Sequence, residues 1–262
     1  MTISDIIKEL EKKFPKNFAE SWDNVGLLVG DRKQDIKKII VTLDATESVI
    51  DMAIERNADL IISHHPLIFS PIKHIDFSEL IGRKIMKLIK NNISLYSLHT
   101  NIDSAPEGLN WFLGECLGFE SGKILEENSF QESSYGIGRV YKLDRNMSVL
   151  EIGEVIKEKL KLEKIIVSSK NIELKSIKKI AIINGSGMGY WRKAKKLGAD
   201  LVLTGDVKYH EAIDAVENGI SVIDIGHYES EIIFGELIKE NLQSKFEVEI
   251  EILNDEPIFK DI

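Results

Sequence analysis

The stretch ADLIISHH (residues 58–65) combines a short apolar run with two adjacent histidines at its end. A continuous apolar run of this length is typical of a strand that is buried on both faces of a sheet. Neighbouring side chains of a strand point to opposite faces, so His64 and His65 are expected to have different surroundings. The pair stands where the run stops, just before Pro66. Its meaning depends on whether other strands end in the same way.

The pattern of this stretch returns in the second part of the chain. ADLIISHH (58–65) corresponds to ADLVLTGD (199–206). KKIIVTLDAT (37–46) corresponds to KKIAIINGSG (178–187) at the same offset. ISLYSLHTNID (93–103) corresponds to ISVIDIGHYESE (220–231). A shift of one residue aligns His99 and Asp103 with His227 and Glu231. Repetition of this kind indicates an internal duplication.

Strands and helices alternate in each half, which predicts an α/β fold with mostly parallel sheets flanked by helices. We expect a first α/β half over 1–119, a connecting embellishment over 120–177 and a second α/β half over 178–262, all working as a single unit. Open parallel sheets bind ligands beyond the carboxyl ends of their strands. Two similar halves therefore predict a metal site in the cleft between them.

The bulk composition excludes several classes of function. The formal net charge is −9 at pH 7, which argues against a broad nucleic-acid-binding surface because phosphate contacts need clustered lysine and arginine. No apolar run approaches the ~20 residues of a membrane span, and the N-terminal stretch lacks the pattern of a signal peptide. The single cysteine, Cys116, allows no intrachain disulfide. We expect a cytoplasmic protein with no nucleic-acid or membrane partner.

Ionisable side chains gather at the ends of the predicted strands. Five of the six histidines lie at or just beyond these ends, and His74 is the exception. Imidazole and carboxylate ligands suit zinc, iron or manganese, and the lack of paired cysteines argues against a closed structural zinc site. Two cations held ~3.5–4 Å apart need a larger ligand set with a bridging carboxylate. The residues found at the strand ends are Asp44, His64, His65, His99, Asp103, Ser186, Asp206, His210, His227 and Glu231.

Several of these residues also have a purely structural explanation. Asp103 could cap the helix that begins near Pro106, and Glu231 could be a first-turn acid favoured by the helix dipole. The turn GSG (185–187) could present backbone N–H groups to an anion, or it could be a tight turn alone. It is not a dinucleotide fingerprint, because Tyr190 stands where the last glycine is required. Recurrence at corresponding strand ends of both halves favours metal binding.

At these residues the chain resembles the GTP cyclohydrolase 1 type 2 homologs, also called NIF-three-like proteins, in the short form without an inserted middle domain. The matching segments run in order over nearly the whole chain: SWDNVGLLVG (21–30), TLDAT (42–46), ADLIISHHPLIF (58–69), SLHTNID (97–103), GSG (185–187), GADLVLTGDVKYH (198–210) and GHYESE (226–231). One departure is Asp206, where family members often have glutamate. The resemblance implies a ring-shaped homohexamer and two divalent cations per chain, held by His64, His65, Asp103, His227 and Glu231, with Glu231 as the bridge.

The resemblance also implies a metal-dependent hydrolase that acts on a nucleotide or a related small molecule, as GTP cyclohydrolase does. His99 and His210 are candidate proton shuttles, because imidazole titrates near neutral pH. Asp44, Ser186 and Asp206 are expected to support the metal ligands or to line the substrate wall. The alternative is a metal-binding oligomeric scaffold or regulator that acts through protein–protein contacts. Removal of the metal ligands would abolish turnover in an enzyme but leave partner binding intact in a scaffold.

Overall fold

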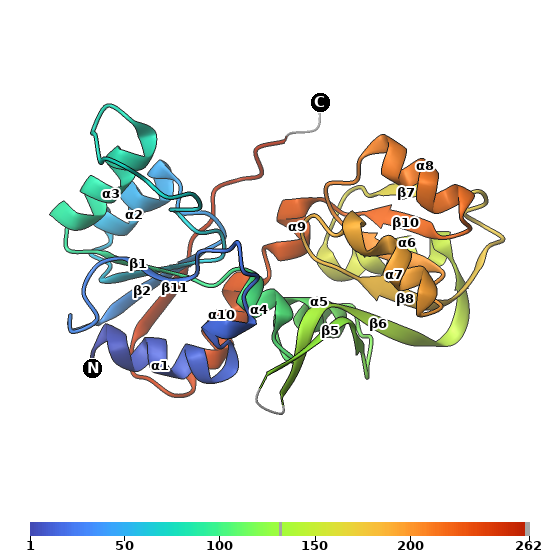
Figure 1. Cartoon of the computed structure of the whole chain (residues 1–262), viewed down its shortest axis with the longest axis horizontal. Helices are drawn as coiled ribbons and strands as arrows, with labels where there is room; N and C mark the ends of the chain where they lie inside the picture. Colours follow the sequence, from blue (N-terminus) through green and yellow to red (C-terminus); the bar gives the residue numbers. More distant parts are fainter. Residues whose placement is uncertain (131–132, 260–262) are drawn as a thin grey trace. The chain divides into compact units, whose positions relative to one another are not determined.

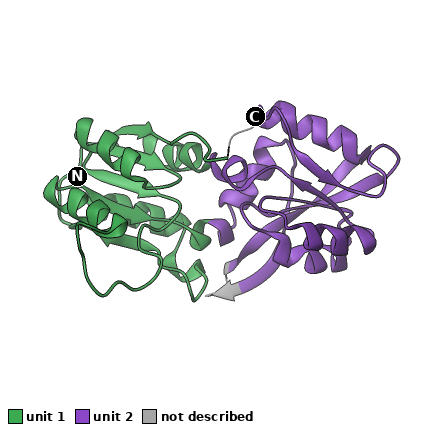
Figure 2. Cartoon of the chain, turned by 90° about the horizontal axis from the view of Figure 1, so that it is seen from above, with its two compact units in different colours: residues 1–102, 234–262 green, residues 103–233 purple. Residues whose placement is uncertain are grey.

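The computed structural model describes residues 1–130 and 133–259, which form two compact units (Figure 1, Figure 2). The first unit comprises residues 1–102 and 234–262, and the second comprises residues 103–233. The chain therefore passes from one unit to the other twice. The halves expected from the sequence have other limits, because 103–119 belongs with the second unit and 234–262 with the first.

The first unit contains a five-stranded sheet in the order β1-β4-β3-β2-β11. Four strands are parallel, and β1 runs antiparallel along β4 at the edge. In Figure 1, α2 and α3 cover one face of this sheet and α1 and α10 cover the other, which explains why the central strands β2 and β3 are buried along almost their whole length. The strands are β1 (Gly26–Val29), β2 (Lys38–Thr42), β3 (Leu60–Ser63), β4 (Ser94–Ser97) and β11 (Glu249–Ile252). The helices are α1 (Ile3–Lys13), η1 (Lys16–Phe18), α2 (Glu47–Glu55), α3 (Leu80–Lys90) and α10 (Phe234–Gln243).

The second unit contains a six-stranded mixed sheet in the order β5-β6-β8-β9-β10-β7. Its centre, β8-β9-β10, is parallel, whereas β5, β6 and β7 pair in antiparallel fashion. These three outer strands come from the segment that the sequence presents as an embellishment. The strands are β5 (Lys123–Phe130), β6 (Ser133–Ser148), β7 (Ile166–Ser168), β8 (Ser176–Ile182), β9 (Leu201–Thr204) and β10 (Ser221–Asp224). The helices are α5 (Leu109–Cys116), α6 (Val149–Leu160), η2 (Met188–Tyr190), α7 (Trp191–Lys196), α8 (Tyr209–Glu217) and α9 (His227–Glu231).

The centres of the two sheets repeat one another down to single hydrogen bonds. Both have an antiparallel edge strand followed by three parallel strands, β1-β4-β3-β2 in one and β7-β10-β9-β8 in the other. Asp59 accepts hydrogen bonds from the backbone N–H groups of Lys37 and Lys38 at 2.7 and 3.0 Å. Asp200 accepts from the two corresponding lysines at 2.8 and 3.1 Å. The internal duplication predicted from the sequence is confirmed.

A short helix follows the same strand in each half of the duplication. The helix α4 (Thr100–Ser104) comes after β4, and α9 comes after β10. The sequence correspondence between His99…Asp103 and His227…Glu231 is therefore also a correspondence between elements.

Successive apolar side chains along the strands point to opposite faces of each sheet and pack against the helices there. In the second unit, Ile180, Leu203 and Ile223 face α5 and α6, while Ala181 and Val202 face α7 and α8. In the first unit, Ile40, Ile61 and Leu95 pack against α2 and α3. Polar side chains begin where these buried runs stop.

Within the part of the chain that the structure describes, none of the helices combines the length and the apolar character of a membrane span.

Candidate metal centre

Three histidines of the first unit gather at the carboxyl ends of its parallel strands. His64 and His65 follow β3, and His99 follows β4. One ring nitrogen from each lies within 4.8 Å of the others, and the ring centroid of His64 is 5.0 Å from that of His65 and 5.3 Å from that of His99. The three meet because β3 and β4 are adjacent and parallel, with Ser63 in register with Ser97. This group could hold a metal ion.

The adjacent histidines have different surroundings, as alternation along a strand predicts. Both residues stay attached to the chain segment that follows β2, since the N–H of His64 donates to Thr42 O at 3.1 Å and that of His65 donates to Leu43 O at 3.0 Å. His64 is fully buried, with its ring 5.1 Å from that of Phe234. The side chain of His65 is 26% exposed. One imidazole of the pair therefore lies in the protein interior and the other meets solvent.

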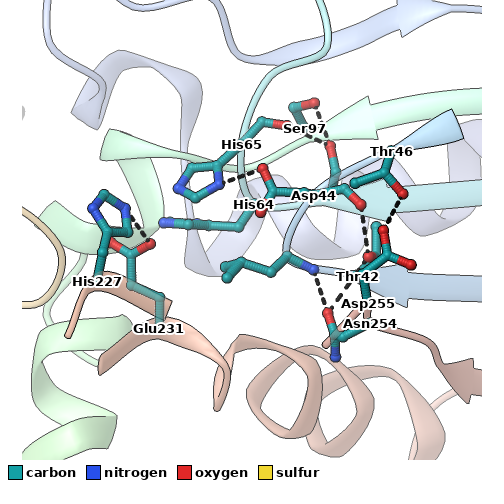
Figure 3. A network of polar contacts seen from close by, with 12 residues as sticks. Thr42, Asp44, Thr46, His64, His65, Ser97, His227, Glu231, Asn254 and Asp255 are labelled. Atoms are coloured by element: carbon teal, nitrogen blue, oxygen red, sulfur yellow. Dashed lines mark hydrogen bonds and ion pairs between the residues drawn. The ribbon is translucent and has the colours of Figure 1, made fainter. Parts of the chain in front are cut away.

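Each imidazole of this group is held at Nδ1 by an oxygen atom. Such a contact fixes the orientation of the ring and favours the tautomer with a lone pair on Nε2, which is how metal-binding histidines are commonly supported. Figure 3 shows the contact between His65 and Asp44, which lies just beyond the end of β2. The oxygen partners are Leu98 O for His64, Asp44 Oδ1 for His65 and Asp23 Oδ1 for His99, each at 2.9 Å.

Asp23 is a supporting residue to which the sequence analysis assigned no role. Its side chain is fully buried and accepts hydrogen bonds from His99, from the Thr100 N–H at 3.0 Å and from the Thr100 hydroxyl. Burial alone would raise the pKa of Asp23, but the hydrogen bonds from His99 and Thr100 outweigh it and lower this pKa to about 2. Asp23 is therefore a carboxylate that fixes His99. The only signal in the sequence is its place in the segment SWDNVG, which does not reveal its partner.

The second unit carries a histidine–acid pair on α9. His227 and Glu231 are four residues apart in this helix, and Nε2 of His227 lies 3.0 Å from Oε2 of Glu231 (Figure 3). Nδ1 of His227 contacts Asp206 Oδ2 at 2.7 Å, so the shorter aspartate at position 206 reaches the imidazole. Asp206 follows β9 as His65 follows β3. Its backbone is in the left-handed region, with φ of 53°, which turns the chain at this point.

Asn184 joins two buried carboxylates of the second unit. Its side-chain N–H groups donate to Asp103 Oδ1 at 2.9 Å and to Glu231 Oε1 at 3.0 Å. Asp103, Asn184 and Glu231 are all buried, and within the described residues Asn184 Oδ1 has no hydrogen-bond partner. Sequence reasoning missed Asn184, although it stands just beyond the end of β8 as the other site residues stand beyond their strands.

Gly185 makes room for the carboxylate of Glu231. A Cβ atom at this position would lie 2.3 Å from Glu231 Oε1, and φ of +58° places Gly185 in the region that favours glycine. The N–H of Gly185 donates to the hydroxyl of Ser230 at 2.8 Å, which ties the turn to α9. The glycine is therefore needed both for the turn and for the position of Glu231.

A buried arginine fixes the turn that follows Asp103. Arg139, on β6, donates to the carbonyl oxygens of Ala105, Pro106, Gly136 and Gly138. Burial lowers the pKa of Arg139 to about 10. The backbone of Asp103 is held further by Asn110, whose side chain donates to Asp103 O at 3.1 Å.

Two of the residues expected from the sequence stand apart from these groups. His210 lies in the first turn of α8, is exposed and has its ring against that of Tyr209, with the centroids 5.5 Å apart. Ser186 is exposed in the turn after β8. Among residues 1–130 and 133–259, neither belongs to a group of three side chains arranged to hold a metal ion.

Comparisons with known proteins give a consistent result over the whole chain. A family model described as Duf34/NIF3 (NGG1p interacting factor 3) matches residues 1–257. A GTP cyclohydrolase 1 type 2 homolog from Clostridium perfringens is 48% identical over 94% of this chain and 95% of its own length. One from Campylobacter jejuni is 38% identical over 93% of each chain.

Solved structures agree with this match. A hypothetical protein from Staphylococcus aureus is 33% identical, with a TM-score of 0.91 over 100% of this chain and 99% of that one. Reduced HcgD from Methanocaldococcus jannaschii is 34% identical, with a TM-score of 0.83 over 97% of this chain and 98% of that one.

Proposed function

Because the chain belongs to the Duf34/NIF3 family, we propose that it is a metal-dependent hydrolase that uses two divalent cations to act on a nucleotide or a related small molecule. The name GTP cyclohydrolase 1 type 2 homolog, carried by its relatives, supports this class of reaction. The observation that carries the proposal is the arrangement of four strand-end histidines, each held at Nδ1 by an oxygen.

The donor set fits a first-row divalent cation, since it combines imidazole nitrogens with carboxylate oxygens. Glu231 suits the role of a bridging ligand, because its two oxygens have different partners, Asn184 at Oε1 and His227 at Oε2. Gly185 leaves the space that this carboxylate occupies. The proposed ligands are His64 and His65 of the first unit and Asp103, His227 and Glu231 of the second.

The remaining residues position these ligands and move protons. When bound, divalent cations lower the pKa of water and polarise an electrophilic carbon or phosphorus. Asp44 and Asp206 hold the rings of His65 and His227. Asp23 orients His99, which we propose as the group that accepts a proton and returns it to the leaving group. The neutral amide of Asn184 holds its two carboxylates without adding charge.

The test is to measure metal content and turnover on the same preparations. After reloading with zinc, iron or manganese, we expect two metal ions per chain and hydrolysis of at least one member of a panel of nucleotides and small esters. His65→Ala and Glu231→Ala should lose metal and turnover. His74→Ala is the control, because this histidine contacts Glu79 at 3.1 Å outside the strand ends. A metal content near zero, or a loaded protein without turnover across the panel, would contradict the proposal.

A second candidate function, a scaffold that acts through protein contacts, is favoured by one surface feature. The segment 69–80 of the first unit exposes five large apolar side chains, those of Phe69, Ile72, Ile75, Phe77 and Leu80. Exposed apolar patches often mark interfaces. Under this proposal the chain forms a homohexamer, and Phe77→Glu should lower the mass measured by light scattering. A scaffold would keep its assembly in Glu231→Ala, whereas an enzyme would lose its activity.

A further inference from the structure

A cavity of about 480 Å³ opens beside His65, entirely within the first unit. It lies just beyond the carboxyl ends of β2 and β3 and against the beginning of α3, which is where open parallel sheets take their ligands. Sites for small molecules commonly have volumes of ~300–1,000 Å³. The side chains that give the cavity its character are Asp44, His65, Leu67, Leu80, Ile81 and Lys84.

Lys84 is the lysine that lines this cavity, and its ammonium group has donors to offer. It is half-buried on α3 and makes no hydrogen bond or ion pair with the residues that the structure describes. Lys87, one turn further along the helix, is instead paired with Asp51 at 2.6 Å and with Glu47 at 3.1 Å. Burial lowers the pKa of Lys84 against the opposing effect of nearby acids, so the charged form lacks solvation that a ligand could supply.

The acids around the cavity are already engaged with other groups. Asp44 holds His65, and Asp255 accepts from the hydroxyl of Thr46 (Figure 3). Glu79 contacts Nε2 of His74 at 3.1 Å, and Glu47 contacts Arg83 at 3.3 Å and Lys87 at 3.1 Å. Each nearby carboxylate therefore has its own partner, and Lys84 is left for an incoming anion.

We propose that this cavity binds the anionic group, phosphate or carboxylate, of a small-molecule ligand, and that Lys84 is its hydrogen-bond donor and charge partner. The apolar part of the molecule packs against Leu67, Leu80 and Ile81. His65 lines the same cavity, so a molecule anchored at Lys84 extends toward a proposed metal ligand. The inference rests on the proposed hydrolase function only for the identification of the occupant as a substrate.

The test measures the binding of simple anions to protein from which a chelator has removed any metal. Inorganic phosphate, phenyl phosphate and benzoate are each titrated into the protein and their binding is measured by calorimetry. The three probes represent free phosphate, a phosphomonoester and a carboxylate. Lys84→Gln should weaken the binding of the preferred anion on the order of tenfold or more, as expected for the loss of a charge-assisted hydrogen bond. Lys90→Gln is the matched control, because Lys90 lies on the same helix over the ring of Phe77, 5.4 Å from its centroid, and does not line the cavity.

The outcomes separate this inference from the proposed function. Lys84-dependent anion binding in a protein that hydrolyses nothing supports the cavity and removes the hydrolase. Conversely, if Lys84→Gln binds all three probes as the unsubstituted protein does, or if no probe binds saturably, the inference is overturned whatever the protein hydrolyses. Where turnover is found, Lys84→Gln should raise KM for an anionic substrate and leave KM for a neutral analogue unchanged.

Discussion

Four histidines share a contact between Nδ1 and an oxygen atom, but the oxygen comes from different groups. A backbone carbonyl holds His64, whereas carboxylates hold His65, His99 and His227. A carboxylate partner raises the basicity of an imidazole more than a carbonyl does, because it stabilises positive charge on the ring. By this general effect, an imidazole held by a carboxylate is a stronger donor toward a cation than one held by a carbonyl.

Gly185→Ala should displace Glu231 and lower the metal content. The added methyl group would lie 2.3 Å from Glu231 Oε1, and the residue would have to adopt φ of +58°. Elemental analysis of reloaded protein should show a lower metal content per chain than in the unsubstituted protein. Gly189→Ala is the control, since a Cβ there has no heavy atom within 4 Å in the described part of the chain. Equal metal content in the two variants would contradict this reading of the turn.

Asn184→Leu should destabilise the chelated protein by about 1–3 kcal/mol, because two buried carboxylate oxygens lose their donor. Urea-induced unfolding followed by tryptophan fluorescence measures the difference. Asn218→Leu provides the comparison, because Asn218 is exposed at the end of α8 and donates only to a carbonyl of its own helix. If the two variants unfold alike, Asn184 does not hold the carboxylates together.

At the scale of elements, a glutamate on α1 links this helix to the segment that follows α10. Glu9 accepts hydrogen bonds from Lys12 at 2.7 Å and from Lys245 at 2.5 Å. These bonds lower the pKa of Glu9 from 4.5 to about 2. Because the pKa is lower in the folded state, the stabilisation is fully present above pH 4.5 and is lost as the pH falls toward 2.

Glu9→Gln should therefore lower the melting temperature at pH 7, and the difference from the unsubstituted protein should narrow between pH 4.5 and pH 2.5. Differential scanning calorimetry over this range checks it. The control is Glu240→Gln, because Glu240 is exposed on α10 and has no hydrogen bond or ion pair with the described residues. A difference that stays constant with pH would show that the two lysines do not stabilise the ionised Glu9.

Local sequence predicts some elements of this fold better than others. The segments that became β2, β3, β4, β9 and β10 are short and rich in apolar residues, and the duplication supports each of them because similar sequences occur in both halves. The sequence near β11 does not indicate which strand β11 pairs with, because the alternating sequence EIEI suits any sheet edge. In the structure β11, near the end of the chain, pairs with β2. The same holds for β7, which pairs with β10.

The candidate site shows the same division. The histidines were predictable because parallel strands end at one edge of a sheet, which a reading of the sequence can locate. Asp23 and Asn184 were not, since each acts through side chains that only folding brings close. The sequence thus locates a side chain that follows a strand, but it does not reveal a partner that comes from a distant part of the chain.

At the scale of the whole molecule, the proposed ligands come from both units, so cations should stabilise both. We expect zinc or manganese to slow hydrogen–deuterium exchange in peptides of residues 1–102 and of residues 103–233 alike. At a free-metal concentration of ~100 Kd, the gain is about 2.7 kcal/mol for each site. In His65→Ala, the protection of the second unit should also fall. Protection confined to one unit would contradict a shared set of ligands.

The division of the chain has a consequence for the order in which the protein takes shape. Residues 103–233 are contiguous, so that unit holds all its strands once they leave the ribosome. The first unit is completed only after residues 234–262 have been synthesised, because its elements α10 and β11 come from the last part of the chain. Until then β2 remains an open sheet edge and His64 lacks the ring of Phe234 beside it. The part that is translated first is thus the part completed last.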